Sequence, residues 1–138
     1  MNGPYLLDTN TVSYIAKGKS PAARARLMAL ENRHAACISA ITEAELRYGL
    51  ARRPEATALH AAIQSVLAKL RILPWASKEA AAYGSLRAKL ELAGIVLSAL
   101  DLQIAAHAVA TGAVLVTSDK AFSQVADLHG IENWATDL

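Results

Sequence analysis

The sequence contains few of the residues that build disulfide-rich or turn-rich proteins. Among 138 residues there is one cysteine, and there are four prolines and seven glycines. A single cysteine excludes an internal disulfide, so the fold does not depend on an oxidising compartment. The scarcity of glycine and proline argues against an all-β sandwich, which needs many tight turns, whereas 30 alanines favour helices.

We expect no segment that directs the chain to a membrane. Its first residues show neither the basic nor the apolar region of a signal peptide, because an aspartate already stands at position 8. The longest candidate for an apolar span, residues 92–100, is interrupted by Gly94 and Ser98 and is far shorter than the ~20 residues that cross a bilayer. We therefore expect a cytoplasmic protein without membrane contact.

Net charge alone does not indicate nucleic-acid binding, because it is only +2. The charge is unevenly distributed, however: residues 1–71 carry +5 and residues 72–138 carry −3. One part of the surface is thus expected to attract phosphates while another part holds unpaired carboxylates.

Short apolar runs alternate with amphipathic segments along the whole chain. Strands are expected at residues 5–7, 36–38, 71–73, 113–116 and 131–134, and helices at 12–17, 21–31, 42–54, 55–70, 78–92 and 102–111. Alternation of this kind predicts parallel pairing. The fold class is therefore α/β, a three-layer α/β/α sandwich with a short parallel central sheet, formed as a single domain over residues 1–138.

Four acidic residues from distant parts of the chain are predicted to meet at one edge of that sheet. Asp8 and Asp119 each follow a predicted strand, while Glu45 and Asp101 lie in the first turns of helices. Because ligands of an open parallel sheet bind beyond the carboxyl ends of its strands, all four face one crevice. Clustered carboxylates need protons or a cation, and oxygen-only ligands suit Mg²⁺ or Mn²⁺. This pattern points to phosphodiester chemistry.

Each acidic residue also has an ordinary structural interpretation. Aspartate is favoured at helix N-termini, and Glu45 is placed to complete a capping box with Thr42. Glu43 is expected to be solvated, and His107 to pack away from the acidic edge. Arg52 and Arg53 suit a phosphate backbone, but also the end of a solvated helix. Zinc, dinucleotide and serine-hydrolase motifs are missing from the sequence.

Four ordered blocks of sequence resemble those of PIN-domain ribonucleases, and more narrowly the VapC toxins of toxin–antitoxin pairs. The blocks are Leu6-Leu7-Asp8-Thr9-Asn10, the segment from Ile38 to Gly49, the segment from Asp101 to Ala108, and the segment from Leu115 to Phe122. The resemblance implies a PIN-like fold. It also implies a catalytic set of Asp8, Glu45, Asp101 and Asp119, with Mg²⁺ or Mn²⁺ bound by Asp8, Asp101 and Asp119 and support from Thr9, Asn10 and Ser118.

The resemblance further implies a metal-dependent endoribonuclease toxin that cuts single-stranded or loop RNA, such as a tRNA or rRNA loop. A cognate antitoxin would neutralise it, operator DNA would be bound only through that antitoxin, and the toxin would form a homodimer or a toxin–antitoxin hetero-oligomer. One departure is Ser98-Ala99-Leu100, where many relatives have a rigid turn before the third acid. The alternatives are a haloacid-dehalogenase-like phosphatase, which needs an acid where Asn10 stands, and a non-catalytic binding module.

Overall fold

Five short strands form one parallel sheet in the computed structural model, which describes residues 4–30 and 35–138. The strands are β1 (Tyr5–Leu7), β2 (Ala36–Ser39), β3 (Arg71–Leu73), β4 (Val114–Val116) and β5 (Ile131–Glu132), in the order β3-β2-β1-β4-β5. The predicted α/β class with a short parallel sheet is therefore confirmed.

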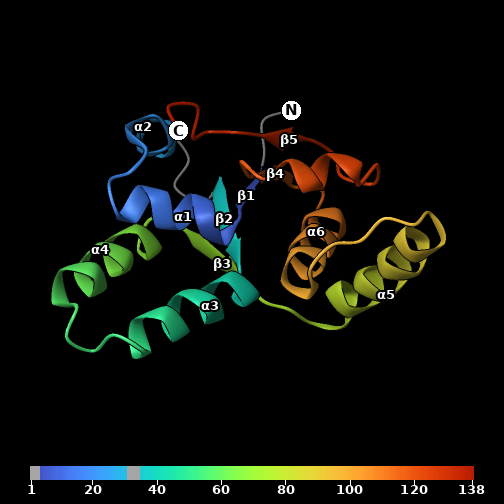
Figure 1. Cartoon of the computed structure of the whole chain (residues 1–138), viewed down its shortest axis with the longest axis horizontal. Coiled ribbons are helices and arrows are strands. Elements are labelled where there is room, and N and C mark those ends of the chain that lie inside the picture. Colours follow the sequence, from blue (N-terminus) through green and yellow to red (C-terminus); the bar gives the residue numbers. More distant parts are fainter. Residues whose placement is uncertain (1–3, 31–34) are drawn as a thin grey trace.

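Helices cover both faces of the sheet. They are α1 (Thr9–Ala16), α2 (Pro21–Met28), α3 (Ala40–Ala51), α4 (Thr57–Leu67), α5 (Ser77–Leu92) and α6 (Ala99–Thr111), followed by the 3₁₀ helix η1 (Lys120–Gln124). Figure 1 shows α1, α2 and α4 on one side of the strands and α5 and α6 on the other. In the part of the chain that the structure describes, no helix is long and apolar enough to cross a membrane.

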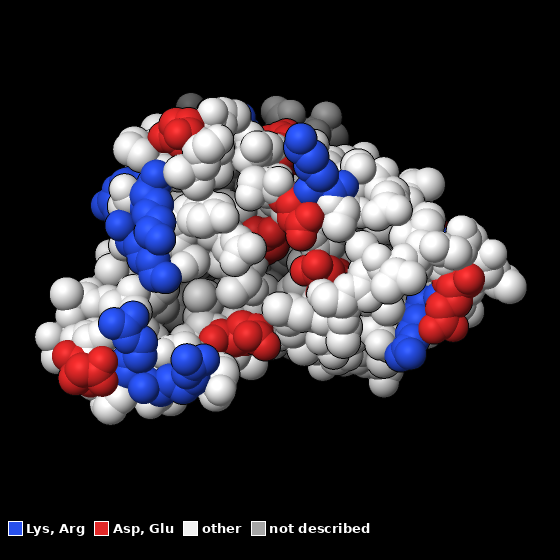
Figure 2. Space-filling view, in the orientation of Figure 1, with Lys and Arg blue, Asp and Glu red and all other residues white. Residues whose placement is uncertain are grey.

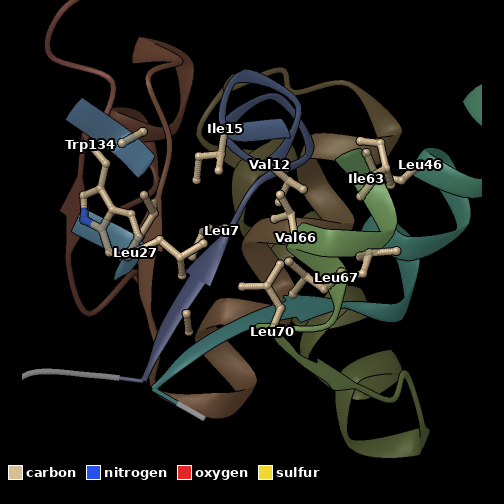
Figure 3. Close-up of a cluster of buried hydrophobic side chains, with 14 of the residues drawn as sticks. Leu7, Val12, Ile15, Leu27, Leu46, Ile63, Val66, Leu67, Leu70 and Trp134 are labelled. Carbon is tan, nitrogen blue, oxygen red and sulfur yellow. The ribbon is translucent and has the colours of Figure 1, made fainter. Parts of the chain in front are cut away.

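Because successive side chains of a strand point to opposite faces, the sheet has a separate apolar core on each face. Leu7 packs with α1, α3 and α4 in one apolar cluster, while its neighbour Leu6 packs with α5 and α6 in the other. Figure 3 shows the first cluster, in which Val12, Ile15 and Val66 gather around Leu7. Cys37 of β2 lies in the second cluster, where burial raises the pKa of its thiol and so disfavours the reactive thiolate.

Several helix boundaries differ from the prediction. α1 begins at Thr9 with Asp8 as its N-cap, three residues earlier than expected, and α4 spans a shorter segment than residues 55–70. α2 starts at Pro21 behind the Ser20 cap as predicted but ends at Met28, and Glu31 lies outside the described residues. The predicted capping box of Thr42 and Glu45 is wrong, because α3 begins at Ala40 under the Ser39 side chain.

Candidate active site

Asp8 stands where β1 ends and α1 begins, and its carboxylate is held from two sides. Its Oδ1 accepts the N–H of Thr11 at 2.9 Å, which caps α1, and its Oδ2 accepts the hydroxyl of Thr117 at 2.6 Å. The side chain is buried, with 7 % of the residue exposed. Asp8 is thus both a helix cap and a fixed, inward carboxylate at the predicted edge of the sheet.

Thr117 is a supporting residue that the sequence analysis missed. Its buried hydroxyl donates to Asp8 and accepts the backbone N–H of Asp119 at 3.0 Å, so it connects the ends of two neighbouring strands. The signal for it lies in the register, because Leu7 pairs with Val116 and the residues that follow each are then side by side. Ser118, the support that was predicted instead, is exposed.

Asp101 and Asp119 approach the same edge from other elements. Asp119 follows β4 and caps η1 by accepting the N–H of Ala121 at 2.9 Å. Asp101 lies in the first turn of α6, where its N–H donates to the Ser98 hydroxyl at 3.1 Å. Ser98-Ala99-Leu100, the departure from the family pattern, is therefore an ordinary capped start of a helix.

The three aspartates influence one another electrostatically. Burial raises the pKa of Asp8, the hydrogen bonds from Thr117 and Thr11 lower it in part, and the charge of Asp119 raises it further. Burial also raises the pKa of Asp101, against the bond to Ser98 and with help from the charges of Asp119 and Asp8. Figure 2 shows acidic side chains gathered over the middle of this face.

Cations in the described part of the chain form no ion pair with the cluster of Asp8, Asp101 and Asp119. Among residues 4–30 and 35–138, no salt bridge includes any of the three. Within the same residues, no three His, Cys, Asp or Glu side chains are close enough to enclose a metal ion by themselves. The cluster therefore consists of oxygen donors with their own charge uncompensated, a set that fits a hydrated hard cation better than a fully enclosed one.

Glu45 lies on a different element and shares a pocket with the two residues that follow Asp8. It is exposed on α3 and lines a pocket of about 190 Å³ together with Thr9 and Asn10 of α1. Thr9 also donates to the hydroxyl of Thr42 at 3.4 Å, which ties α1 to α3. Since the capping box is not formed, Glu45 has no structural role at the start of α3.

Glu43 and the two arginines of α3 make local contacts instead. Glu43 pairs with Arg47 at 2.8 Å, one helical turn away. Arg52 places its guanidinium 5.5 Å from the ring centre of Tyr48, and Arg53 lies 3.8 Å from the carboxylate of Glu55. Of the two arginines predicted to guide RNA, Arg52 is the one free of an acidic partner in the described part of the chain.

His107 is a packing residue, as predicted. It is fully buried in α6, its Nδ1 is 2.7 Å from the Ser39 hydroxyl, and its ring meets that of Trp75 edge-on at 5.5 Å. Its Nε2 is buried without a hydrogen-bond partner among the described residues. Burial lowers the pKa of this imidazole, against the opposing charge of Glu79.

Comparison with known proteins identifies the class to which this fold and acidic edge belong. The family model of the PIN domain matches residues 5–128. Ribonuclease VapC2 of Haemophilus influenzae is 36% identical over 131 residues, which cover 94% of this chain and 97% of the relative. The tRNA(fMet)-specific endonuclease VapC of Salmonella typhimurium is 31% identical over the same length, with the same coverage.

A solved structure agrees with the family match. The chain superimposes with a TM-score of 0.86 on a chain of VapBC2 from Rickettsia felis, crystallised bound to a DNA fragment from its promoter. That chain is 32% identical, and the match covers 94% of this protein and 98% of the other. The protein is therefore a nuclease of the PIN-domain class. Within that class it belongs to the VapC ribonucleases, the toxins of VapBC toxin–antitoxin systems.

Proposed function

We propose that Asp8, Asp101, Asp119 and Glu45 are the catalytic acids of a metal-dependent endoribonuclease that hydrolyses single-stranded or loop RNA. The observation that supports this most directly is the mutual electrostatic influence of three aspartates from three elements, with burial raising the pKa of two of them. Like charges held close together disfavour ionisation, and a bound cation relieves that repulsion, so this arrangement suits a cation-binding site.

The donor set fits Mg²⁺ or Mn²⁺, with Asp8, Asp101 and Asp119 as ligands and Glu45 nearby. When bound, such an ion activates water and neutralises charge at the phosphodiester. The chain contributes a carboxylate of fixed orientation at Asp8, since Thr117 and Thr11 both bind it. Thr9 and Asn10 lie next to Glu45 and are placed to orient RNA and water as supporting groups, and exposed Ser118 is proposed in the same role.

The proposed substrate is a loop of tRNA, with rRNA as the other class. The relative from Salmonella typhimurium carries the name of a tRNA(fMet)-specific endonuclease, and splayed nucleotides of a loop enter a crevice that an A-form duplex cannot. We also propose a cognate antitoxin as partner, since the Rickettsia felis relative was solved as VapBC2 on promoter DNA. Operator DNA is then bound only through the antitoxin.

Products and metal dependence test the proposed reaction together. An end-labelled RNA hairpin is incubated with the purified protein in Mg²⁺ or Mn²⁺ and, separately, in EDTA, and the new ends are analysed by mass. Attack by water leaves a 5′-phosphate and a 3′-hydroxyl, and EDTA should abolish cutting. Two results would contradict the metal mechanism. A 2′,3′-cyclic phosphate would indicate attack by the RNA's own 2′-hydroxyl, and undiminished cutting in EDTA would show that no bound metal is needed.

A further inference from the structure

Four residues of α3 form an exposed row that leads away from the acidic cluster. Glu45, Tyr48, Gly49 and Arg52 are separated by three, four and seven residues, a spacing that brings them to one side of a helix. All four are exposed. We call them the α3 row; it begins beside the proposed catalytic acids and extends for about two helical turns, roughly 11 Å.

Gly49 has no structural explanation within the described residues. It lies inside a helix, where glycine is less favourable than alanine, and its φ is not among the positive values found at Gly18, Gly94 and Gly112. A Cβ built on Gly49 would meet no atom within 4 Å, so no neighbour requires the absence of a side chain. Because glycine has no side chain, Gly49 leaves open the pocket that it lines.

That pocket, of about 190 Å³, lies between α1, α3 and α4 and is open to solvent. Its floor is apolar and comes from Leu46, Leu50, Leu59 and Ile63, and its rim is polar and includes Lys17 and Glu45. The volume is below the roughly 300 Å³ at which pockets for small-molecule ligands begin. It therefore suits one flat group with apolar faces and a polar edge.

Tyr48 and Arg52 form the outer half of the row. Tyr48 is 61% exposed, and the Arg52 guanidinium lies 5.5 Å from the centre of its ring. An exposed aromatic ring is a surface on which a nucleobase stacks, and a guanidinium binds phosphate. Figure 2 shows basic side chains beside the acidic ones on this face, a distribution that suits a polyanion reaching the acidic cluster.

We propose that the α3 row binds the single-stranded RNA next to the bond that is cut, an inference that rests on the proposed function. One unstacked nucleobase occupies the pocket beside Gly49, with its polar edge toward Glu45 and Lys17. The neighbouring base stacks on Tyr48, and its phosphate lies against Arg52. Two cations, Lys17 at the pocket and Arg52 three residues beyond Gly49 on α3, favour a polyanion such as RNA over an apolar peptide as the occupant.

Filling the pocket tests this binding mode without relying on cleavage. In the full-length Asp8→Asn protein, which is used so that RNA stays intact, the Kd for a fluorescein-labelled 12-nucleotide single-stranded RNA is measured by fluorescence anisotropy. Gly49→Leu should raise that Kd at least about fivefold, the lower end of what one base contact contributes. Its Tm should not fall, because leucine is the better helix former and a Cβ there is unobstructed.

Gly84→Leu in α5 is the matched control. Gly84 is also an exposed glycine inside a helix, with no atom within 4 Å of a built Cβ, and it lies outside the pocket. It should leave the Kd for RNA unchanged and likewise keep the Tm. Tyr48→Ala should weaken binding by a similar factor to Gly49→Leu, and Tyr48→Phe should restore it, since only the ring is needed for stacking.

Unchanged RNA affinity in Gly49→Leu would overturn the proposal. It would also be overturned if Gly49→Leu kept its affinity for RNA but lost binding of the co-expressed antitoxin, since the pocket would then be a protein-binding site. Failure of the proposed function would give a different result. The protein with Asp8 intact would then cut RNA in EDTA, or would cut it no faster than Asp8→Asn does. The anisotropy measurement does not depend on that outcome.

Discussion

Asp8 combines two demands that conflict at neutral pH. Its carboxylate caps α1 and accepts the Thr117 hydroxyl, yet burial and the charge of Asp119 raise its pKa. The folded protein therefore holds this proton more tightly than the unfolded chain does. Stability contributed by the protonated form is lost as the pH rises from 3.8 through the folded pKa, so at pH 7 the ionised carboxylate is a cost.

Asp8→Asn should consequently give a folded and inactive protein. Asparagine retains an oxygen for the Thr11 N–H and removes the buried charge, so the Tm at pH 7 should equal or exceed that of the parent. Cleavage should fall by about 10²- to 10³-fold, the typical effect of removing one charge-stabilising group. Asp101→Asn should behave alike. Thermal unfolding and RNA cleavage measured on the same samples test this, and a marked drop in Tm would show that Asp8 acts mainly as a helix cap.

The two glutamates of α3 provide a second comparison at the scale of single residues. Glu43 is engaged by Arg47, whereas Glu45 lines the pocket next to Thr9 and Asn10. Glu45→Gln should therefore lower cleavage at least about tenfold, while Glu43→Gln should change it little and lower stability by only about 0.3–0.5 kcal/mol, through the lost ion pair. The opposite result, an inactive Glu43→Gln with an active Glu45→Gln, would show that the assignment is reversed.

The residue types of the candidate site could be predicted, but one essential contact could not. Asp8, Asp101 and Asp119 were found because each stands where an element begins or ends, and the structure brings their charges together. Thr117 was missed because its role depends on the pairing of Leu7 with Val116. A pattern along one chain indicates where strands end, but the register between strands follows from packing of the whole sheet.

At the scale of helices and strands, the predicted elements are present in the structure, but some of their predicted first residues are wrong. Thr42 and Glu45 matched a capping box, yet Ser39 caps α3 because β2 passes directly into the helix. Asp8 likewise caps α1 ahead of Thr9, Asn10 and Thr11, although those three side chains also suit the position. Where several adjacent residues are capable caps, the choice is made by the path on which the preceding strand leaves the sheet.

The contact between α6 and the start of α3 makes stability depend on pH. His107 is buried against the Ser39 cap, and burial lowers its pKa below 6.5. The unfolded chain then binds this proton more readily than the folded protein does. Stability is therefore fully present above pH 6.5 and declines as the pH falls below it, by up to about 1.4 kcal/mol per pH unit.

His107→Asn should remove most of that decline, because the amide occupies the place of Nδ1 beside Ser39 but does not titrate. The free energy of unfolding, measured by urea titration at pH 7.5 and pH 5.5, should differ less in the variant than in the parent. His129→Asn, at an exposed histidine, is the control and should retain the parental difference. An equal loss of stability in the parent and in His107→Asn would assign the pH dependence to other groups.

The arrangement of the whole molecule follows largely from the alternation of strands and helices. That alternation predicted parallel pairing and helices on both faces, and the edge at which the acids lie follows from strand direction. The strand order β3-β2-β1-β4-β5 was beyond sequence reasoning, because it is set by which helix packs on which face. Its effect is to place β1 and β4 side by side in the middle, where Asp8 and Thr117 meet.

The end of α5 is the part of the surface that most resembles an interface. Leu92 is 92% exposed and Val96 is 87% exposed, beside a pocket of about 270 Å³ lined by Tyr83, Leu90, Ile95 and other residues of α5 and α6. The lining of this pocket also includes the charged side chains of Arg87 and Glu91. Apolar side chains exposed to the degree of Leu92 and Val96 are typical of a surface that another protein covers. We expect a second copy of the toxin to cover it within the toxin–antitoxin assembly.

Co-purification of the toxin with its antitoxin should therefore yield a complex larger than 1:1, measured by light scattering during size-exclusion chromatography. Leu92→Glu and Val96→Glu should reduce its mass to that of one toxin with its antitoxin, because burying an added charge in an apolar interface is unfavourable. Leu138→Glu, at another exposed leucine, should leave the mass unchanged. A parent toxin that remains a lone monomer in the presence of antitoxin would contradict the assembly, and variants that keep the parental mass would place the interface elsewhere.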